Sequence, residues 1–318
     1  MNRRKVILSF LLFISLNVFC QSEGETIKIP RSELKEVYEM VKSYKDSLRI
    51  TKDSLNQCQL IQIDEKSSLL ESSTLMNVDE FHALIIAVEN YDNLKNLRYP
   101  IEDGSKLKEI LISDYTFKSE NIEFLKDPTK IEIDNILDWY SNETNKEMIN
   151  SNLLIFYAGH GGLNVRLDDG YWCPSDGNPD KQSSLLRNSS IREYIKLIQA
   201  RNILLISDAC WAGSLMRSTE DYVKINKYQD IYNLSSRIYM SSGVMSEVPD
   251  KSTFMSQLVL ALKNNKHKYL SASKLFSIIS EDVLFQTPRT EEKNVIPQCS
   301  YIGDSGHKKG GDFFFIKR

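Results

Sequence analysis

Two residues that could carry out chemistry together each follow an apolar run of the sequence. His160 follows residues 153–157 and is flanked by glycines, and Cys210 follows residues 203–206 and precedes the turn residue Gly213. In open parallel sheets ligands bind beyond the carboxyl ends of the strands, so both side chains are predicted to lie at that edge of one sheet. A thiolate is a nucleophile, and an imidazole within hydrogen-bond reach can take the thiol proton and later protonate a leaving amine. The alternative is that Cys210 is a small buried apolar residue, as cysteines usually are.

The glycines beside His160 would let a backbone N–H group approach a substrate carbonyl. We therefore assign the N–H groups of Gly161 and Cys210 to an oxyanion hole, which stabilises negative charge on the carbonyl oxygen. Lone histidines are more often structural than catalytic. The chain has three of these: His82, His267 and His307.

The two motifs resemble those of a known family. Residues 157–161 (Tyr-Ala-Gly-His-Gly) and 208–213 (Asp-Ala-Cys-Trp-Ala-Gly) are similar to the histidine and cysteine motifs of the caspase-like peptidases of clan CD, and more to metacaspases and bacterial orthocaspases than to animal caspases. The separation of 50 residues is also that of the caspases. The resemblance covers residues 80–318. It implies the caspase-hemoglobinase fold, an α/β architecture with a six-stranded, mostly parallel sheet, helices on both faces and an antiparallel last strand.

The resemblance implies a cysteine endopeptidase with Cys210 as nucleophile and His160 as general base and acid. Asp208 stands two residues before the cysteine, where caspases have glutamine and metacaspases have aspartate. Asp103, in the loop after the first strand, matches the second acidic pocket residue of metacaspases. Two carboxylates in a partly desolvated pocket repel each other unless a cation joins them, so cleavage after Arg or Lys is predicted. Alternatively, Asp208 caps the following turn and Asp103 caps the first helix.

No metal site or cofactor is expected from the sequence. Metacaspases commonly have serine two residues before the histidine, and Ala158 here removes that hydroxyl, so a calcium role implied by the resemblance has no support in the residues. The expected partners are protein or peptide substrates. The chain has 40 basic and 43 acidic residues, a balance that does not suggest nucleic-acid binding.

From residue 79 onward, apolar strands alternate with amphipathic helices over 240 residues, which is typical of one α/β domain with a mainly parallel sheet. Strands are predicted at residues 82–88, 122–125, 153–157, 203–210, 238–242 and 313–316, and a β-hairpin at 165–173, broken by Asp168-Asp169-Gly170. The long polar segment 214–236 is either a site of self-processing or an ordinary surface insertion.

The N-terminal part of the chain has a different character. Residues 1–20 are predicted to be a signal peptide, because three basic residues precede the uncharged run 6–19, and export to the periplasm or medium follows; acylation of Cys20 or an uncleaved anchor are the alternatives. No membrane span is expected after cleavage. Residues 21–78 are predicted to be helical, and the heptad seam within residues 31–70 favours either self-association or a long helix against the following domain.

Four cysteines would remain after cleavage, with spacings that fit neither a zinc site nor a disulfide scaffold. A bridge between Cys173 and Cys299 is compatible with an oxidising compartment. The main alternative to a peptidase is a scaffold protein that has a coiled-coil segment and a caspase-like domain without activity. A non-peptidase hydrolase with a Cys-His pair is the third interpretation, and the resemblance disfavours it.

Overall fold

The computed structural model describes residues 76–209, 227–243, 251–286 and 297–318. Several predictions therefore fall outside the described residues. They concern the signal peptide 1–20, the helical segment up to residue 75, Cys58, Cys210 and most of the segment 214–236. The described residues belong to one compact unit, and among them no helix is long and apolar enough to cross a membrane.

A six-stranded sheet forms the centre of the domain, in the order β10-β8-β7-β3-β1-β2. Its strands are β1 (Phe81–Ala87), β2 (Ile122–Lys126), β3 (Asn152–Ala158), β7 (Asn202–Asp208), β8 (Ser236–Ser241) and β10 (Gln298–Tyr301). All neighbours pair in parallel except β10, which is antiparallel to β8. Every residue of β1, β3, β7 and β8 is buried, because helices cover both faces of a parallel sheet. The predicted fold class is confirmed.

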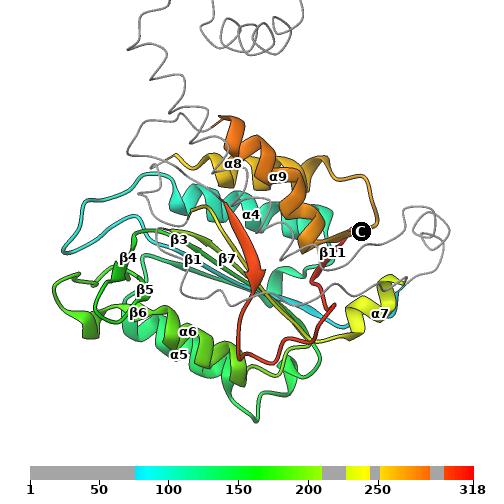
Figure 1. The fold of residues 1–318 in the computed structure, drawn as a ribbon, viewed down its shortest axis with the longest axis horizontal. Coiled ribbons are helices and arrows are strands. Elements are labelled where there is room, and N and C mark those ends of the chain that lie inside the picture. The colour runs from blue at the N-terminus through cyan, green and yellow to red at the C-terminus, as the bar shows by residue number, and fades with distance from the viewer. Residues whose placement is uncertain (1–75, 210–226, 244–250, 287–296) are drawn as a thin grey trace, which may run out of the picture. The chain divides into compact units, whose positions relative to one another are not determined.

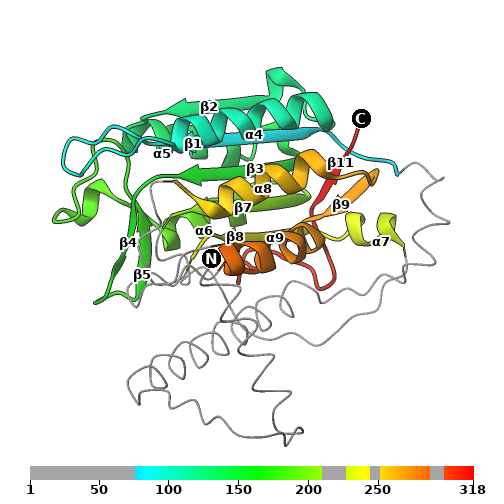
Figure 2. The same cartoon turned by 90° about the horizontal axis from the view of Figure 1, so that it is seen from above.

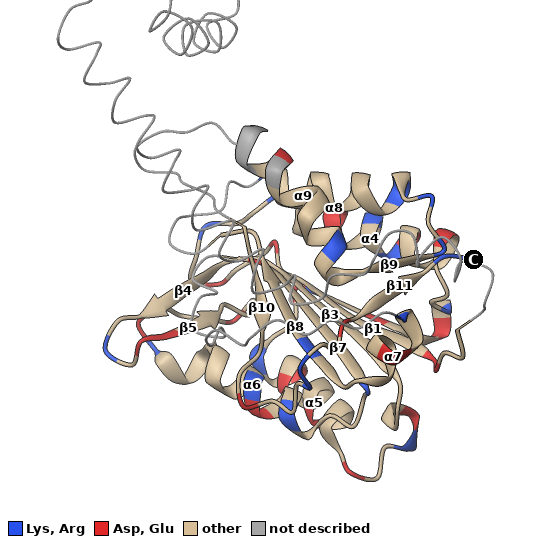
Figure 3. Cartoon of the chain, turned by 45° about the vertical axis from the view of Figure 1, so that its right-hand side comes forward, with Lys and Arg blue, Asp and Glu red and all other residues tan. Residues whose placement is uncertain are grey.

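Helices cover both faces of this sheet (Figure 1). One face carries α4 (Pro100–Asp114), α8 (Thr253–Asn264) and α9 (Ala272–Gln286), and the other carries α5 (Lys130–Ser141) and α6 (Asn188–Leu197). Each layer buries its apolar stripe in a separate core, such as Leu107 and Leu258 on the first face and Ile133 and Ile191 on the second. Both α5 and α6 contain charged residues of both signs (Figure 3).

The last strand of the sequence lies elsewhere than predicted. Instead of joining the main sheet, β11 (Phe314–Ile316) pairs antiparallel with β9 (Tyr269–Ser271) in a separate two-stranded sheet. The sixth strand of the main sheet is β10, whose sequence Gln-Cys-Ser-Tyr contains no apolar run. The periodicity of a short segment indicates a strand but does not tell which sheet it joins.

The predicted hairpin is present, and its turn lies earlier in the sequence than expected. β4 (Gly161–Asn164) and β5 (Asp169–Trp172) pair antiparallel, and β5 also pairs with β6 (Leu186–Arg187). The side chain of Asn164 accepts hydrogen bonds from the N–H groups of Arg166 and Leu167, at 3.1 and 3.2 Å. This Asx-type contact starts the turn at residue 165, where the sequence alone favoured Asp168 to Gly170. In Figure 2 the hairpin bends away from the end of the main sheet at which β3 finishes.

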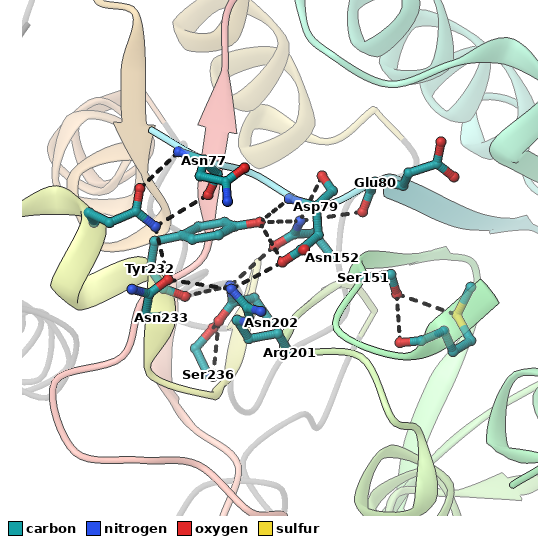
Figure 4. A network of polar contacts seen from close by, with 12 residues as sticks. Asn77, Asp79, Glu80, Ser151, Asn152, Arg201, Asn202, Tyr232, Asn233 and Ser236 are labelled. Carbon is teal, nitrogen blue, oxygen red and sulfur yellow. Dashed lines mark hydrogen bonds and ion pairs between the residues drawn. The ribbon is translucent and has the colours of Figure 1, made fainter. Parts of the chain in front are cut away.

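Three strands begin level with one another because a polar network holds their first residues (Figure 4). Asn152 donates to the Tyr232 hydroxyl at 2.8 Å, and Asn202 donates to the Asn152 side chain at 3.1 Å and to the Tyr232 carbonyl at 3.0 Å. Ser236 donates to Asn202 at 3.0 Å. Tyr232 lies in α7 (Tyr228–Asn233), so the segment 214–236 is not entirely a loop. With Asn152 opposite Asn202, the final residues of β3 and β7, Ala158 and Asp208, are also opposite each other.

Candidate active site

His160 lies on the turn between β3 and β4, at the carboxyl edge of the sheet, as the sequence predicted. Its backbone N–H donates to the Tyr91 hydroxyl at 2.7 Å. Its carbonyl accepts from the Tyr157 hydroxyl at 2.6 Å and from the Cys173 N–H at 2.9 Å. The His160 ring packs against the Tyr91 ring with 4.8 Å between centroids. Both backbone groups and one face of the ring are therefore fixed, as a group that transfers protons requires.

The tautomer of His160 follows from one contact. Nε2 lies 2.7 Å from the backbone carbonyl oxygen of Lys95, in the loop between β1 and α4. A carbonyl oxygen can only accept a hydrogen bond, so Nε2 carries the proton and Nδ1 of the neutral ring has its lone pair free to act as a base. Tyr91 belongs to the same loop. Its hydroxyl, which accepts from the His160 N–H, donates to the Val88 carbonyl at 3.1 Å.

Gly159 makes this arrangement possible. A Cβ atom at this position would lie 2.6 Å from the Tyr91 hydroxyl oxygen and 2.8 Å from that of Tyr157, and the backbone has φ of +158°. Both hydroxyls hold the backbone of His160, so a side chain here would displace the groups that position the histidine. The glycine before the histidine is needed for this close approach.

Asp208 is the last residue of β7 and is buried, with 7% of its surface exposed. Its carboxylate accepts a hydrogen bond from the Ser252 hydroxyl at 3.0 Å, and the same hydroxyl caps α8 by accepting from the Met255 N–H at 3.1 Å. Burial raises the pKa of Asp208 to about 6, and the hydroxyls of Ser242 and Ser252 partly offset this effect. The helix cap thus holds a carboxylate that burial disfavours in its charged form.

Asp103 lies close enough to Asp208 for their charges to interact. Burial and, after it, the charge of Asp208 raise the pKa of Asp103 to about 6, while Lys106 partly opposes the shift. Asp103 lies within the first turn of α4 and not in the loop where the sequence analysis placed it, because the helix begins at Pro100. The first turn of α4 is capped by the side chain of Glu89, which accepts from the Ile101 N–H at 2.9 Å. The two carboxylates are therefore within electrostatic range of each other.

The backbone N–H of Gly161, one of the two predicted oxyanion-hole donors, points to the open side of β4. The Cys173 N–H donates to the His160 carbonyl, so the pair Gly161–Trp172 occupies a non-hydrogen-bonded position of the β4–β5 ladder. At such positions the backbone N–H points away from the partner strand. The other predicted donor belongs to Cys210, which lies outside the described residues. The chain just before Cys210 is close to the histidine turn, because the Gly159 N–H lies 3.5 Å from the Asp208 carbonyl oxygen.

Two remaining features concern metals and disulfides. Within the described ranges, no cluster of three His, Cys, Asp or Glu side chains could hold a metal ion. Cys173 is a buried thiol and Cys299 takes part in a disulfide, so the bridge that the sequence allowed between these two residues is not formed.

Sequence reasoning missed three contributors to the site. Ser252 could have been found as the helix cap that precedes an apolar run. Tyr91 follows a buried strand, but nothing in its type indicates a contact with residue 160. The Lys95 carbonyl gives no signal in a sequence, because every residue has a backbone carbonyl.

The fold and the site define an α/β protein with a histidine and an acidic pair gathered at the carboxyl ends of its central strands. The chain belongs to the caspase domain family, whose family model matches residues 80–302. It is 28% identical over 185 residues to Metacaspase-1 of Eremothecium gossypii; the match covers 50% of this chain and 39% of that protein. The crystal structure of Caspase-1 from Spodoptera frugiperda resembles it in fold with a TM-score of 0.51 and 14% identity, over 72% of this chain and 89% of that one. The chain thus carries a caspase-like peptidase domain.

Proposed function

We propose that the protein is a cysteine endopeptidase in which Cys210 is the nucleophile and His160 the general base and acid. The observation that carries this proposal is the contact of His160 Nε2 with the Lys95 carbonyl, which leaves Nδ1 available for a thiol proton. Nδ1 takes the Cys210 proton, the thiolate attacks the scissile carbonyl, and the Gly161 and Cys210 N–H groups stabilise the resulting oxyanion. The protonated ring then gives this proton to the leaving amine. Nδ1 next deprotonates the water that hydrolyses the thioester.

We propose that this enzyme cleaves after Arg or Lys. The charges of the buried Asp208 and the half-buried Asp103 interact, and each carboxyl has a pKa raised to about 6. A substrate guanidinium would stabilise both ionised carboxylates, whereas an Asp side chain would add a third negative charge. Arginine should be preferred modestly over lysine, because it can form two parallel hydrogen bonds with one carboxylate.

The remaining proposals concern export, self-association, cofactors and processing. We propose export directed by residues 1–20, self-association through residues 31–70, and activity without a metal cofactor. Processing within the segment 214–236 stays a prediction. Mass spectrometry of a fully active preparation tests it, and an intact segment in that preparation contradicts it.

The proposed activity is tested by incubating the purified chain 21–318 with a peptide library beside its Cys210→Ala variant. Cleavage after basic residues is expected for the wild type only, together with selective alkylation of Cys210 by a thiol reagent at neutral pH. Equal cleavage by the Cys210→Ala variant would exclude the proposed nucleophile. A folded wild type that cleaves nothing and is not alkylated selectively would favour the scaffold function instead.

A further inference from the structure

β4 is an edge strand that begins at the candidate catalytic histidine. The small sheet has the order β4-β5-β6, so β4 has a neighbour on one side only. In the β4–β5 ladder Gly162 and Tyr171 form the hydrogen-bonded pair, and Gly161 and Leu163 occupy the alternate positions. The N–H and C=O groups of Gly161 and Leu163 therefore point to the open side. In the described part of the chain, nothing is hydrogen-bonded to these outward groups.

Natural proteins usually cover, charge or shorten an exposed strand edge, because it can pair with another extended chain. Here the hairpin tip that follows β4 carries two exposed apolar side chains among charged ones. Val165 is 80% exposed and Leu167 is 55% exposed, and they alternate with the exposed Arg166 and Asp168. An extended peptide that paired along β4 would also reach these two side chains.

The chemistry of the proposed reaction decides which part of a substrate lies beside β4. His160 must protonate the leaving nitrogen, so that nitrogen lies against the histidine ring. The acyl-side residue lies at the acidic pair on β7 and α4. The peptide that continues from the leaving nitrogen therefore starts at His160, from which β4 also starts.

We propose that the open edge of β4, from Gly161 to Leu163, binds the leaving-group segment of the substrate as an added β-strand. This inference rests on the proposed peptidase function and defines how that substrate is held. With the Gly161 N–H on the scissile carbonyl, a peptide parallel to β4 places its second leaving-side residue between the Gly161 C=O and the Leu163 N–H. The contacts are all to backbone, so they select an extended leaving segment of at least two residues and not a particular sequence.

The test replaces Leu163 by Pro, which removes the outward N–H at a place where an edge strand tolerates proline. The matched control is Leu163→Ala, which shortens the same side chain and keeps the N–H. Two substrates share one acyl side; one ends in a fluorogenic amine, and the other continues for four leaving-side residues. In Leu163→Pro the ratio of kcat/KM for the long substrate to that for the short one should fall by roughly 3- to 10-fold relative to Leu163→Ala, the value of one backbone hydrogen bond.

A binding measurement separates failure of this inference from failure of the proposed activity. The long peptide is titrated into Cys210→Ala protein that carries either Leu163→Pro or Leu163→Ala. The proline variant should bind it more weakly by a similar factor, and methylation of the second leaving-side nitrogen should weaken binding to the alanine control. The assignment would be overturned if the proline and alanine variants bound the long peptide with equal affinity, or if both gave the same ratio of kcat/KM for the long and the short substrate. A change in oligomeric state without a change in peptide affinity would also overturn it. These affinities are informative even if the wild type cleaves neither substrate.

Discussion

Replacing Asp208 by Asn should make the folded protein more stable and less active on basic substrates. Burial raises the pKa of Asp208 from its ordinary value of 3.8 to about 6. A folded-state pKa above the unfolded one means that the free energy of unfolding falls as the pH rises from about 4 to about 6, and stays low above that range. The full difference corresponds to about 3 kcal/mol. Asn removes the buried charge and can still accept the Ser252 hydrogen bond.

Urea unfolding at two pH values measures this effect in a Cys210→Ala background, where self-cleavage is excluded. Relative to the parent, Asp208→Asn should gain up to about 3 kcal/mol at pH 8 and less than about 1 kcal/mol at pH 4. The control is Asp180→Asn, an exposed aspartate away from the pocket, for which the two pH values should give the same small change. A gain for Asp208→Asn that does not depend on pH would refute the argument from burial.

The activity of the same variant tests whether the buried charge serves substrate recognition. A hydrogen bond to a charged group contributes about 1.5–3 kcal/mol, so kcat/KM for an Arg substrate should fall roughly 10- to 150-fold in Asp208→Asn. Cleavage of a substrate with an uncharged residue at that position should change far less. An unaltered Arg preference would mean that the pocket is elsewhere, whatever the change in stability.

Three further predictions concern the histidine turn and the acidic pair. Gly159→Ala should lower kcat at least about tenfold with a modest loss of stability, because the added Cβ displaces the Tyr91 and Tyr157 hydroxyls. Unchanged kinetics would show that these hydroxyls do not position the histidine. Tyr91→Phe leaves the His160 N–H without its acceptor and should cost about 1–3 kcal/mol in urea unfolding together with a lower kcat, whereas an effect on neither would contradict the proposed role. For Arg substrates, kcat/KM should rise with pH through about 6 as Asp208 and its acidic partner ionise, and this step should be absent for uncharged substrates.

The sequence predicted those parts of the fold in which residue type and burial agree. β3 and β7 are apolar runs that end in polar residues, so both their position and the edge at which they end could be read. β10 could not, because its residues are mixed in polarity and it is held by pairing with β8. For β11 the element was right and its sheet was wrong, since a short strand of aromatic residues is buried equally well in either sheet.

In the candidate site, too, some residues could be predicted from the sequence and others could not. Side chains whose chemistry is evident from their type, His160 and Asp208, were placed at the correct edge. The sequence analysis places Asp103 in a loop, whereas Pro100 starts α4 and Asp103 lies in the first turn of that helix. The Lys95 carbonyl, which sets the histidine tautomer, depends on how a loop folds back over residue 160 and has no counterpart in the pattern of side chains.

The common starting line of β3 and β7 has a consequence for insertions and deletions. Both strands have seven residues and start at paired asparagines, so the distance from that line to the candidate site is fixed by residue count. One residue added inside β3 would advance His160 by about 3.3 Å and turn the following side chains to the opposite face. The same residue added before Asn152, in the exposed connection at residues 143–147, would be absorbed without moving the histidine. Length variation in homologous chains should therefore be confined to the connections, while the two strands keep their residue count.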